Sequence, residues 1–463
     1  MKLKKIAALI AVAGISAPAF ATNGMNMEGF GVVATAMGGA SMAYENGPGA
    51  MMNNPATLGL MPQGRGIGFA IGQLGPDVNA SVPAFGMNAA SGGDSYLMPA
   101  FGYIQKSGNL AFGVGIYAQG GMGTEYSAGS FMSQGTGKDA RSEVGVGRVI
   151  FPLAYNVSDA LTIGGSIDWV WATMDIKMAA GGADFAAMTT GMSGAMPGAL
   201  GALSGFGADT FRLDFSDNND FGGSAYGSGF AAKLGFTYKL SPALTVGGTY
   251  HSKTSLDDME TGNSAAAFSA YNVAGGAGFL GAVPGKVTIH NFQWPETYGL
   301  GIAYQPSEKW LLAFDYKRLN WSEVMKDFRM TYSAPNVMGM GAGSASMKIS
   351  QNWEDQDIFM IGASYKVNDA LTLRFGGNFA DNPVPNNRVH PLFPATVEEH
   401  YTVGFGYLFN KQNGIDFSLT YAPEVTVTGT QATGAPGSGI GGNNGIRISH
   451  SQVSWVLQYG YRF

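Results

Sequence analysis

Residues 151–169, FPLAYNVSDALTIGGSIDW, contain the pattern that decides the fold. Apolar residues alternate with small or polar ones on both sides of a central Asn-Val-Ser-Asp, and a tyrosine closes the first half. Such alternation gives a strand one apolar face and one polar face. The stretch therefore predicts a β-hairpin with a tight turn.

The same design occurs five more times along the chain. Each copy has an alternating strand, an aromatic residue near its end, a short turn rich in Asn, Ser, Asp, Pro or Gly, and a second alternating strand. The copies cover residues 101–117, 234–250, 300–316, 361–377 and 403–421. Six hairpins, one strand at about residues 65–74 and one at the C-terminus predict fourteen antiparallel strands.

The alternation also indicates what surrounds the sheet. Trp310, Leu312 and Phe314 share one face of their strand, whereas Ala313 and Asp315 share the other. Only 13% of the residues are charged, and beyond the N-terminal region no run of about 18 apolar residues suits a spanning helix. A closed sheet satisfies its backbone groups in lipid. The expected fold class is all-β, a membrane β-barrel; a soluble β-sandwich or propeller is the alternative.

Both ends of the chain indicate export to the outer membrane. Residues 1–21 resemble a signal peptide, with basic residues before a short apolar run and Ala19-Phe20-Ala21 at the cleavage site. The last residues, VSWVLQYGYRF, resemble the signal that the barrel-assembly machinery of bacterial outer membranes recognises. Without Lys2, Lys4 and Lys5 the formal charge falls from −6 to −9, which argues against nucleic acid as a partner. The absence of cysteine excludes disulfides and a lipidated cysteine.

Residues 45–60, ENGPGAMMNNPATLGL, follow neither the strand period nor the helix period. An apolar segment of this kind needs a place to be buried, and the lumen of a barrel offers one. Residues 22–62 are therefore predicted to form an N-terminal hatch inside a barrel of residues 63–463, with a turn at Asn54-Pro55. The apolar side chains expected to contact a ligand are Met25, Met27, Phe30, Val32 and Val33.

Short motifs are spread along almost the whole chain. They are Asn53-Asn54-Pro55-Ala56, GMGTEY at residues 121–126, PETY at residues 295–298, Trp353-Glu354-Asp355 and DNPVP at residues 381–385. In this order they resemble motifs of the FadL family of outer-membrane transporters for long-chain fatty acids, which includes the TodX-type transporters of aromatic hydrocarbons.

The resemblance implies a fourteen-stranded barrel with its lumen plugged by the hatch, and it assigns Asn53, Asn54, Pro55 and Ala56 to hatch gating. It also implies capture of the ligand at outer loops, transfer to a site beside the hatch and lateral release through a kink in the third strand. Candidates for the kink are Gly113, Gly115, Gly120 and Gly121; glycine that only relieves barrel curvature is the alternative, chiefly for the first two.

The outer loops are expected at about residues 179–224 and 255–284. Their Met, Leu and Phe residues predict either short amphipathic helices around an apolar groove or flexible loops of low complexity. The expected substrate is a long-chain fatty acid, with an aromatic or aliphatic hydrocarbon as the alternative. A carboxylate needs a basic partner, and the candidates on lumen faces are Arg148, Lys253, Lys317 and Arg374.

Catalysis has little support in the sequence. No G-x-S-x-G is present, and the five histidines lack metal-site spacing. A G-x-G-x-x-G match at residues 437–442 lies in a Gly-rich loop with no helix after it, so it is interpreted as chance. We expect no enzyme, no metal and no cofactor, and a monomer surrounded by outer-membrane lipid. A general porin and an outer-membrane hydrolase are the weaker alternatives.

Overall fold

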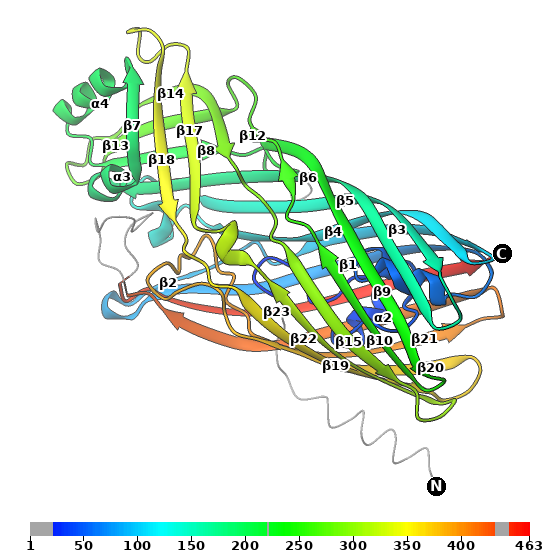
Figure 1. Cartoon of the computed structure of the whole chain (residues 1–463). Coiled ribbons are helices and arrows are strands. Elements are labelled where there is room, and N and C mark those ends of the chain that lie inside the picture. Colours follow the sequence, from blue (N-terminus) through cyan, green and yellow to red (C-terminus); the bar gives the residue numbers. More distant parts are fainter. Residues whose placement is uncertain (1–21, 220–221, 431–443) are drawn as a thin grey trace.

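The computed structural model describes residues 22–219, 222–430 and 444–463. The predicted signal peptide and the match at residues 437–442 lie outside the described residues. The 23 described strands belong to one antiparallel sheet that curls into an elongated barrel (Figure 1). Within the described part of the chain, no helix is long and apolar enough to cross a membrane.

Strand pairing closes the barrel, because the last strand pairs with the first through residues 66–81. The closed circuit contains eighteen strands. In circuit order they are β1 (Gly64–Val82), β3 (Tyr96–Ser107), β4 (Leu110–Tyr126), β5 (Ala140–Asn156), β6 (Leu161–Gly181), β8 (Thr210–Phe215), β13 (Ala266–Asn272), β14 (Gly278–His290), β12 (Met259–Glu260), β9 (Ala225–Ser241), β10 (Leu244–His251), β15 (Thr297–Tyr304), β16 (Trp310–Leu319), β19 (Gln356–Lys366), β20 (Leu371–Ala380), β21 (Glu399–Leu408), β22 (Asn413–Thr428) and β23 (Arg447–Arg462).

The predicted number of fourteen strands is therefore wrong. Four strands, β8, β13, β14 and β12, enter the circuit between β6 and β9. They come mainly from the two segments expected to be loops, where the surrounding Gly-rich sequence hides their alternation. Further along β6, residues 161–174 pair directly with β9. The four added strands thus widen the barrel at one end only.

The wide end carries an extension of the sheet. β14 also pairs with β17 (Asp327–Ala334), β17 with β18 (Gly343–Ser350), and β18 with β7 (Thr189–Gly194). Helices α3 (Gly182–Met188) and α4 (Met196–Gly205) lie beside it (Figure 1). The first expected loop thus contains short helices, whereas the second is folded into strands. The remaining short elements are β2 (Met87–Ala90), β11 (Ser255–Leu256), η3 (Pro83–Phe85), η4 (Phe131–Ser133) and η5 (Trp321–Glu323).

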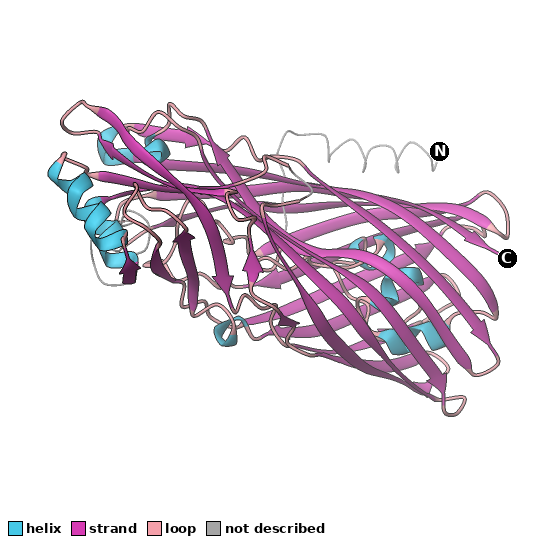
Figure 2. Ribbon diagram, turned by 90° about the horizontal axis from the view of Figure 1, so that it is seen from above, coloured by secondary structure: helices cyan, strands magenta, loops and turns pink. Residues whose placement is uncertain are grey.

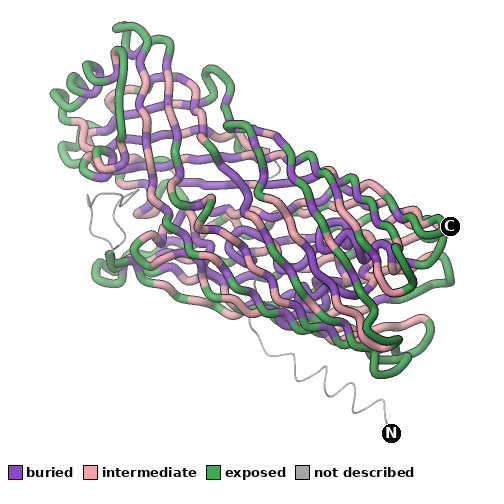
Figure 3. Tube along the Cα trace, in the orientation of Figure 1, coloured by how far each residue is buried: buried purple, intermediate pink, exposed green. Residues whose placement is uncertain are grey.

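The two faces of the wall have the predicted character. Trp310, Leu312 and Phe314 are 41%, 41% and 45% exposed on the outside, whereas Ala313 and Asp315 are buried inside. Figure 3 shows the same alternation of exposed and buried positions along the barrel strands. The apolar outer face and the filled interior are those of a membrane barrel.

The N-terminal segment lies inside the barrel. It forms α2 (Val32–Thr35), η1 (Gly47–Met51) and η2 (Pro55–Leu60), and Figure 2 shows helices within the strand wall at the narrow end. η2 begins at Pro55, whose fixed φ suits a first helical position, and the Asn54 side chain caps it by accepting from the Ala56 amide at 3.1 Å.

Candidate functional site

The wall is interrupted at β4, the third strand of the circuit. Its register with β5 shifts between Ala118 and Gly120, which marks a β-bulge. A bulge adds a residue and changes which face the following side chains occupy. Before it, Phe112 and Ile116 are exposed at even positions; after it, the even-numbered Tyr126 is completely buried.

The bulge coincides with a gap between β3 and β4. Pairing of these strands stops at Phe101 and Ile116. Residues 96–100 of β3 continue to pair with β1, and β4 beyond Ile116 continues to pair with β5. Among the described residues, each of the two strands therefore has an edge without a β-strand partner at this height of the wall.

The N-terminal segment occupies part of this gap from the inside. The Gly121 amide donates to the Met25 carbonyl at 3.0 Å, and the Met27 amide donates to the Gln119 carbonyl at 3.3 Å. Asn26 and Gly120 form an isolated β-bridge. Gly120 has φ +149°, and a Cβ there would overlap the Met25 carbonyl oxygen. Only glycine fits this position without displacing the N-terminal segment.

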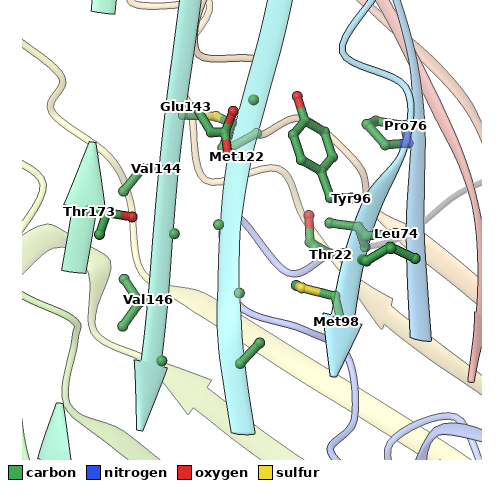
Figure 4. A pocket seen from close by; sticks show the side chains of 18 of the residues that line it. Thr22, Leu74, Pro76, Tyr96, Met98, Met122, Glu143, Val144, Val146 and Thr173 are labelled. Atoms are coloured by element: carbon green, nitrogen blue, oxygen red, sulfur yellow. The ribbon is translucent and has the colours of Figure 1, made fainter. Parts of the chain in front are cut away.

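A cavity of about 290 Å³ passes through the gap; we call it the lateral cavity. Thr22 and Gly24 line it on the lumen side, whereas Leu97 and Ile116, which are 42% and 44% exposed, line it on the outer side. Figure 4 shows side chains from β1, β3, β4 and β5 around it, among them Met98, Met122 and Val146. The lateral cavity connects the interior with the lipid-facing surface.

A second cavity of about 20 Å³, the inner cavity, lies beside the N-terminal segment. Its lining is mainly Met and aromatic: Met25, Met122, Met174, Met325, Phe292, Phe328, Phe393 and Trp353. Met side chains are flexible and polarizable and adapt to apolar ligands. The small free volume can therefore enlarge around a compact guest without a change of fold.

Three buried tryptophans support this region. Trp321 contacts Trp294 and Trp353 edge to face, with ring centroids 5.5 and 5.3 Å apart. The Trp294 indole donates to the Asn26 side chain at 3.2 Å. The stack thus runs from the N-terminal segment to the wall of the inner cavity, which Trp353 lines.

The apolar ligand-contact candidates do not lie together. Of the five, only Met25 lines the lateral or the inner cavity. Met27 and Phe30 pack in a separate cluster with Met51 and Tyr117. Val32 is buried in α2, and Val33 lines a third cavity at the narrow end of the barrel. Met27, Phe30, Val32 and Val33 thus line neither the lateral nor the inner cavity, and their contact with a ligand stays a prediction.

The motif residues of the predicted hatch contact the barrel wall. The Asn54 side chain donates to the carbonyls of Met42 and Phe236 at 2.7 and 3.0 Å. The Asn53 side chain donates to the Phe30 carbonyl at 2.8 Å. Pro55 and Ala56 leave no room for a Cβ at Gly164 of β6. These contacts join the segment to β6 and β9 and to its own earlier residues.

The kink candidates divide into two pairs. Gly120 and Gly121 sit at the bulge and line the lateral cavity. Gly113 and Gly115 face inward against Met51 and line neither cavity. Both glycines lie close to the N-terminal segment, and their part in a kink stays a prediction.

The basic candidates for a carboxylate lie elsewhere. Arg148 is buried with Asp168 at 2.9 Å and also contacts Gln119. Lys317 is buried near the Glu28 carbonyl at 3.4 Å, and Arg374 pairs with Asp416 at 2.7 Å. Lys253 follows β10 in an exposed loop, so its expected position on a lumen face is wrong. Among the described residues lining the lateral and inner cavities there is no lysine or arginine.

Sequence reasoning missed most of the inner cavity. Phe292, Phe328 and Phe393 come from three distant segments that no local pattern links. Residues 381–398 fold inward, and Val384, Val389 and Leu392 are buried. Their apolar side chains among four prolines were the available signal, because such a segment cannot be solvated as an ordinary loop. Within the described residues no group of three or more His, Asp or Glu residues could hold a metal ion.

Comparison with known proteins gives one consistent result. Residues 7–463 match the sequence model of a family described as "Outer membrane protein transport protein (OMPP1/FadL/TodX)". The crystal structure of the Pseudomonas putida toluene transporter TodX is 30% identical, with 94% of this chain and 99% of that chain covered and a TM-score of 0.80. The Ralstonia pickettii toluene transporter TbuX is also 30% identical, with the same coverage and a TM-score of 0.73.

Curated relatives match over shorter regions. The long-chain fatty acid transport protein of Salmonella typhi is 22% identical over 270 residues, which are 58% of this chain and 57% of that protein. The matched regions span 36% to 57% of the lengths of the curated relatives.

Proposed function

The chain belongs to the outer membrane protein transport family (OMPP1/FadL/TodX), and from this premise we propose that it takes up small neutral hydrophobic compounds, monoaromatic hydrocarbons foremost. It is an outer-membrane β-barrel of a family of channels and not an enzyme. The proposal concerns the compound that passes and the route that it takes.

The observation that carries the proposal is the chemistry of the two cavities. The inner cavity is lined mainly by Met and aromatic side chains, together with the acids Glu143 and Asp175. No described lysine or arginine lines either cavity, and His450 of the lateral cavity donates to the Pro394 carbonyl. An unpaired carboxylate in such surroundings costs several kcal/mol of desolvation, whereas an uncharged ring costs nothing comparable. The similar proteins TodX and TbuX are toluene transporters.

A long-chain fatty acid, the substrate first expected from the sequence, is the second candidate. The name of the Salmonella typhi relative supports it, as does the third cavity of about 290 Å³, which Arg374, Lys411 and Arg462 line. Against it, Arg374 already pairs with Asp416, and Arg462 lies 3.4 Å from Glu45. A carboxylate there would compete with these acids.

The proposed route begins at the wide end, where loops capture the compound. It continues to the inner cavity beside Met25 and leaves through the lateral cavity into the membrane. Residues 22–62 act as the hatch that keeps the lumen closed to ions. Their hydrogen bonds to β4, β9 and β16 support this role. The same bonds at Met25 and Met27 link the hatch to the gap.

Two measurements test the proposal. Compounds that co-purify with the protein are extracted and identified by mass spectrometry, and initial uptake rates of labelled toluene and oleate are compared in cells with and without the protein. We expect neutral lipophilic compounds and protein-dependent uptake of toluene. Recovery of fatty acids with protein-dependent uptake of oleate alone would replace the first candidate by the second.

The hatch is tested separately from the substrate. Deletion of residues 22–61 is expected to raise single-channel conductance for small ions in planar bilayers, because nothing else described fills the narrow end. Conductance that stays at the wild-type level would contradict the hatch and leave a general porin without a plug as the better description.

A further inference from the structure

The lateral and inner cavities meet at a neck. Met122, Glu143 and Val144 line both cavities. On one side of these residues, Gly24 lines the lateral cavity and the next residue, Met25, lines the inner cavity. On the other side, Pro394 lines the lateral cavity and Phe393 lines the inner cavity. The neck side chains are therefore Met25, Met122, Glu143, Val144 and Phe393, and a compound that moves between the cavities has to pass them.

These five side chains differ in how easily they can move aside. Met25 and Met122 have unbranched, flexible side chains that rearrange at low cost. Glu143 and Val144 are fixed on β5; Val144 is small, and the Glu143 carboxylate is held by Arg141 at 2.5 Å. Phe393 is the bulky member, and its ring is partly exposed although its neighbours Leu392 and Pro394 are buried. The width of the neck therefore depends chiefly on where the backbone holds Phe393.

The backbone around Phe393 is held by hydrogen bonds to its carbonyls. Tyr126 of β4 donates to the Pro391 carbonyl at 2.9 Å, and His450 of β23 donates to the Pro394 carbonyl at 2.6 Å. Ser142 of β5 donates to the Leu392 carbonyl. Three strands of the wall thus fix the segment, and Pro391 and Pro394 restrict it further.

The Phe393 ring has aromatic neighbours on the inner side. Its centroid lies 6.4 Å from that of Phe328 and 5.9 Å from that of His390. Both distances fall within the range of aromatic pairs. The ring therefore has a preferred position at the neck instead of swinging freely into either cavity.

We propose that Phe393 determines substrate size: it admits compounds with one aromatic ring from the inner to the lateral cavity and holds back fused-ring compounds. The inference rests on the proposed function and adds a residue that sets its selectivity. The rigid backbone around Phe393 limits the size of the compound that can pass, whereas the flexible Met25 and Met122 side chains adapt to single rings with different substituents. A fused second ring would have to displace Phe393 from a backbone bonded to three strands.

The test compares initial uptake rates of labelled toluene and naphthalene in outer-membrane-intact cells. Phe393→Ala is expected to raise the ratio of naphthalene to toluene uptake by about tenfold, since one pocket group commonly changes discrimination by this factor. Phe393→Trp is expected to lower toluene uptake while the barrel remains folded. Leu392→Ala is the matched control, because Leu392 is buried in the same segment and lines neither cavity.

Folding of each variant is checked by its heat-modifiable migration in gels, and Phe393→Leu replaces Phe393→Ala if the latter is not assembled. An unchanged uptake ratio in a folded Phe393→Ala or Phe393→Leu variant would overturn the inference, as would an equal change in Leu392→Ala. Wild-type protein that transports neither compound would contradict the proposed function itself. The two failures are thus distinguishable.

Discussion

Gly120 is the residue on which the junction of hatch and wall depends. Its φ of +149° is accessible to glycine, and its hydrogen atoms face the Met25 carbonyl at the point where β4 bulges. Any side chain here must move either the N-terminal segment or the strand. The absence of a Cβ at Gly120 therefore lets the N-terminal segment pack against β4 at the bulge, beside the gap in the wall.

Gly120→Ala is expected to lower the stability of the folded barrel by roughly 1–3 kcal/mol, the usual cost of such backbone strain, and to loosen residues 25–27. Thermal unfolding in detergent, followed by circular dichroism, measures the first effect. Gly129→Ala is the control, because no atom lies within 4 Å of a Cβ there and φ is not positive. Equal unfolding temperatures for the two variants would contradict the assignment of strain to Gly120.

Asn54 is the second residue with a role that can be isolated. It is completely buried, caps η2 and donates to two carbonyls. Asn54→Ala leaves these groups without partners, at a cost of about 1–3 kcal/mol to the docked hatch. We expect more frequent large-conductance openings in planar bilayers than in wild type. The exposed Asn88→Ala serves as control; openings at the wild-type frequency in Asn54→Ala would exclude a latch at Asn54.

At the scale of elements, the sequence predicted the regular strands and missed the irregular ones. Tight turns and period-two alternation mark hairpins such as residues 300–316 without help from the rest of the fold. β12 has only two residues, and β8 and β13 are short and lie among glycines, so pairing partners far away in sequence decide their state. The strand count failed for this reason, although the all-β membrane barrel itself is confirmed.

The proposed exit of the compound through the gap between β3 and β4 can be tested by filling the lateral cavity. Gly145 of β5 lines the lateral cavity, and the nearest atom to a Cβ there is the Thr173 hydroxyl oxygen at 3.5 Å, so a larger side chain fits. Gly145→Phe should fill the outer opening and reduce toluene uptake to the rate of cells without the protein. Its unfolding temperature should stay that of wild type.

Gly129→Phe is the matched control for the exit, since it adds the same ring at an open position away from the cavity. Toluene uptake that persists in a folded Gly145→Phe variant would mean that the compound leaves by another path, for example past the third cavity at the narrow end.

At the scale of the whole molecule, the hatch couples stability to pH. Glu28 of the N-terminal segment is buried, and its carboxylate accepts from Thr420 of β22 at 2.9 Å. Burial raises the pKa of Glu28 from 4.5 to about 7, with the Thr420 hydrogen bond and Lys317 opposing the shift. Between pH 4.5 and about 7, Glu28 thus keeps its proton in the folded protein but loses it in the unfolded chain. The stabilising contribution of Glu28 to the free energy of unfolding is therefore fully present below pH 4.5 and is lost as the pH rises through about 7.

The Glu28→Gln substitution keeps the shape of the side chain and removes its titratable carboxyl group. At pH 8 the variant is expected to be more stable than wild type by at most about 3 kcal/mol, and at pH 4 the two should be equal. Thermal unfolding at pH 4, 6 and 8 checks this. A difference between variant and wild type that does not change with pH would contradict the raised pKa.

The functional site shows where sequence reasoning ends. The motif at Asn53 and Asn54 and the glycines at 120 and 121 were found from local sequence, and the structure brings the latter pair to the gap. The aromatic lining could not be found in this way, because Phe292, Phe328 and Phe393 meet only after the barrel has closed. Charge alone suggested the basic residues as partners for a carboxylate. In the lumen, however, buried basic side chains pair mainly with acidic ones, as Arg148 does with Asp168.

The edge-to-face packing of Trp294, Trp321 and Trp353 affects the circular dichroism of the protein. Indole rings held edge to face at 5.3 and 5.5 Å share their electronic excitation, which gives a paired signal of opposite sign in circular dichroism. The chain has seven tryptophans, and the stack contains three of them. Because the Trp294 indole is bonded to Asn26 and Trp353 borders the inner cavity, displacement of the N-terminal segment would disturb this signal. The protein thus contains its own label-free reporter for any displacement of the N-terminal segment.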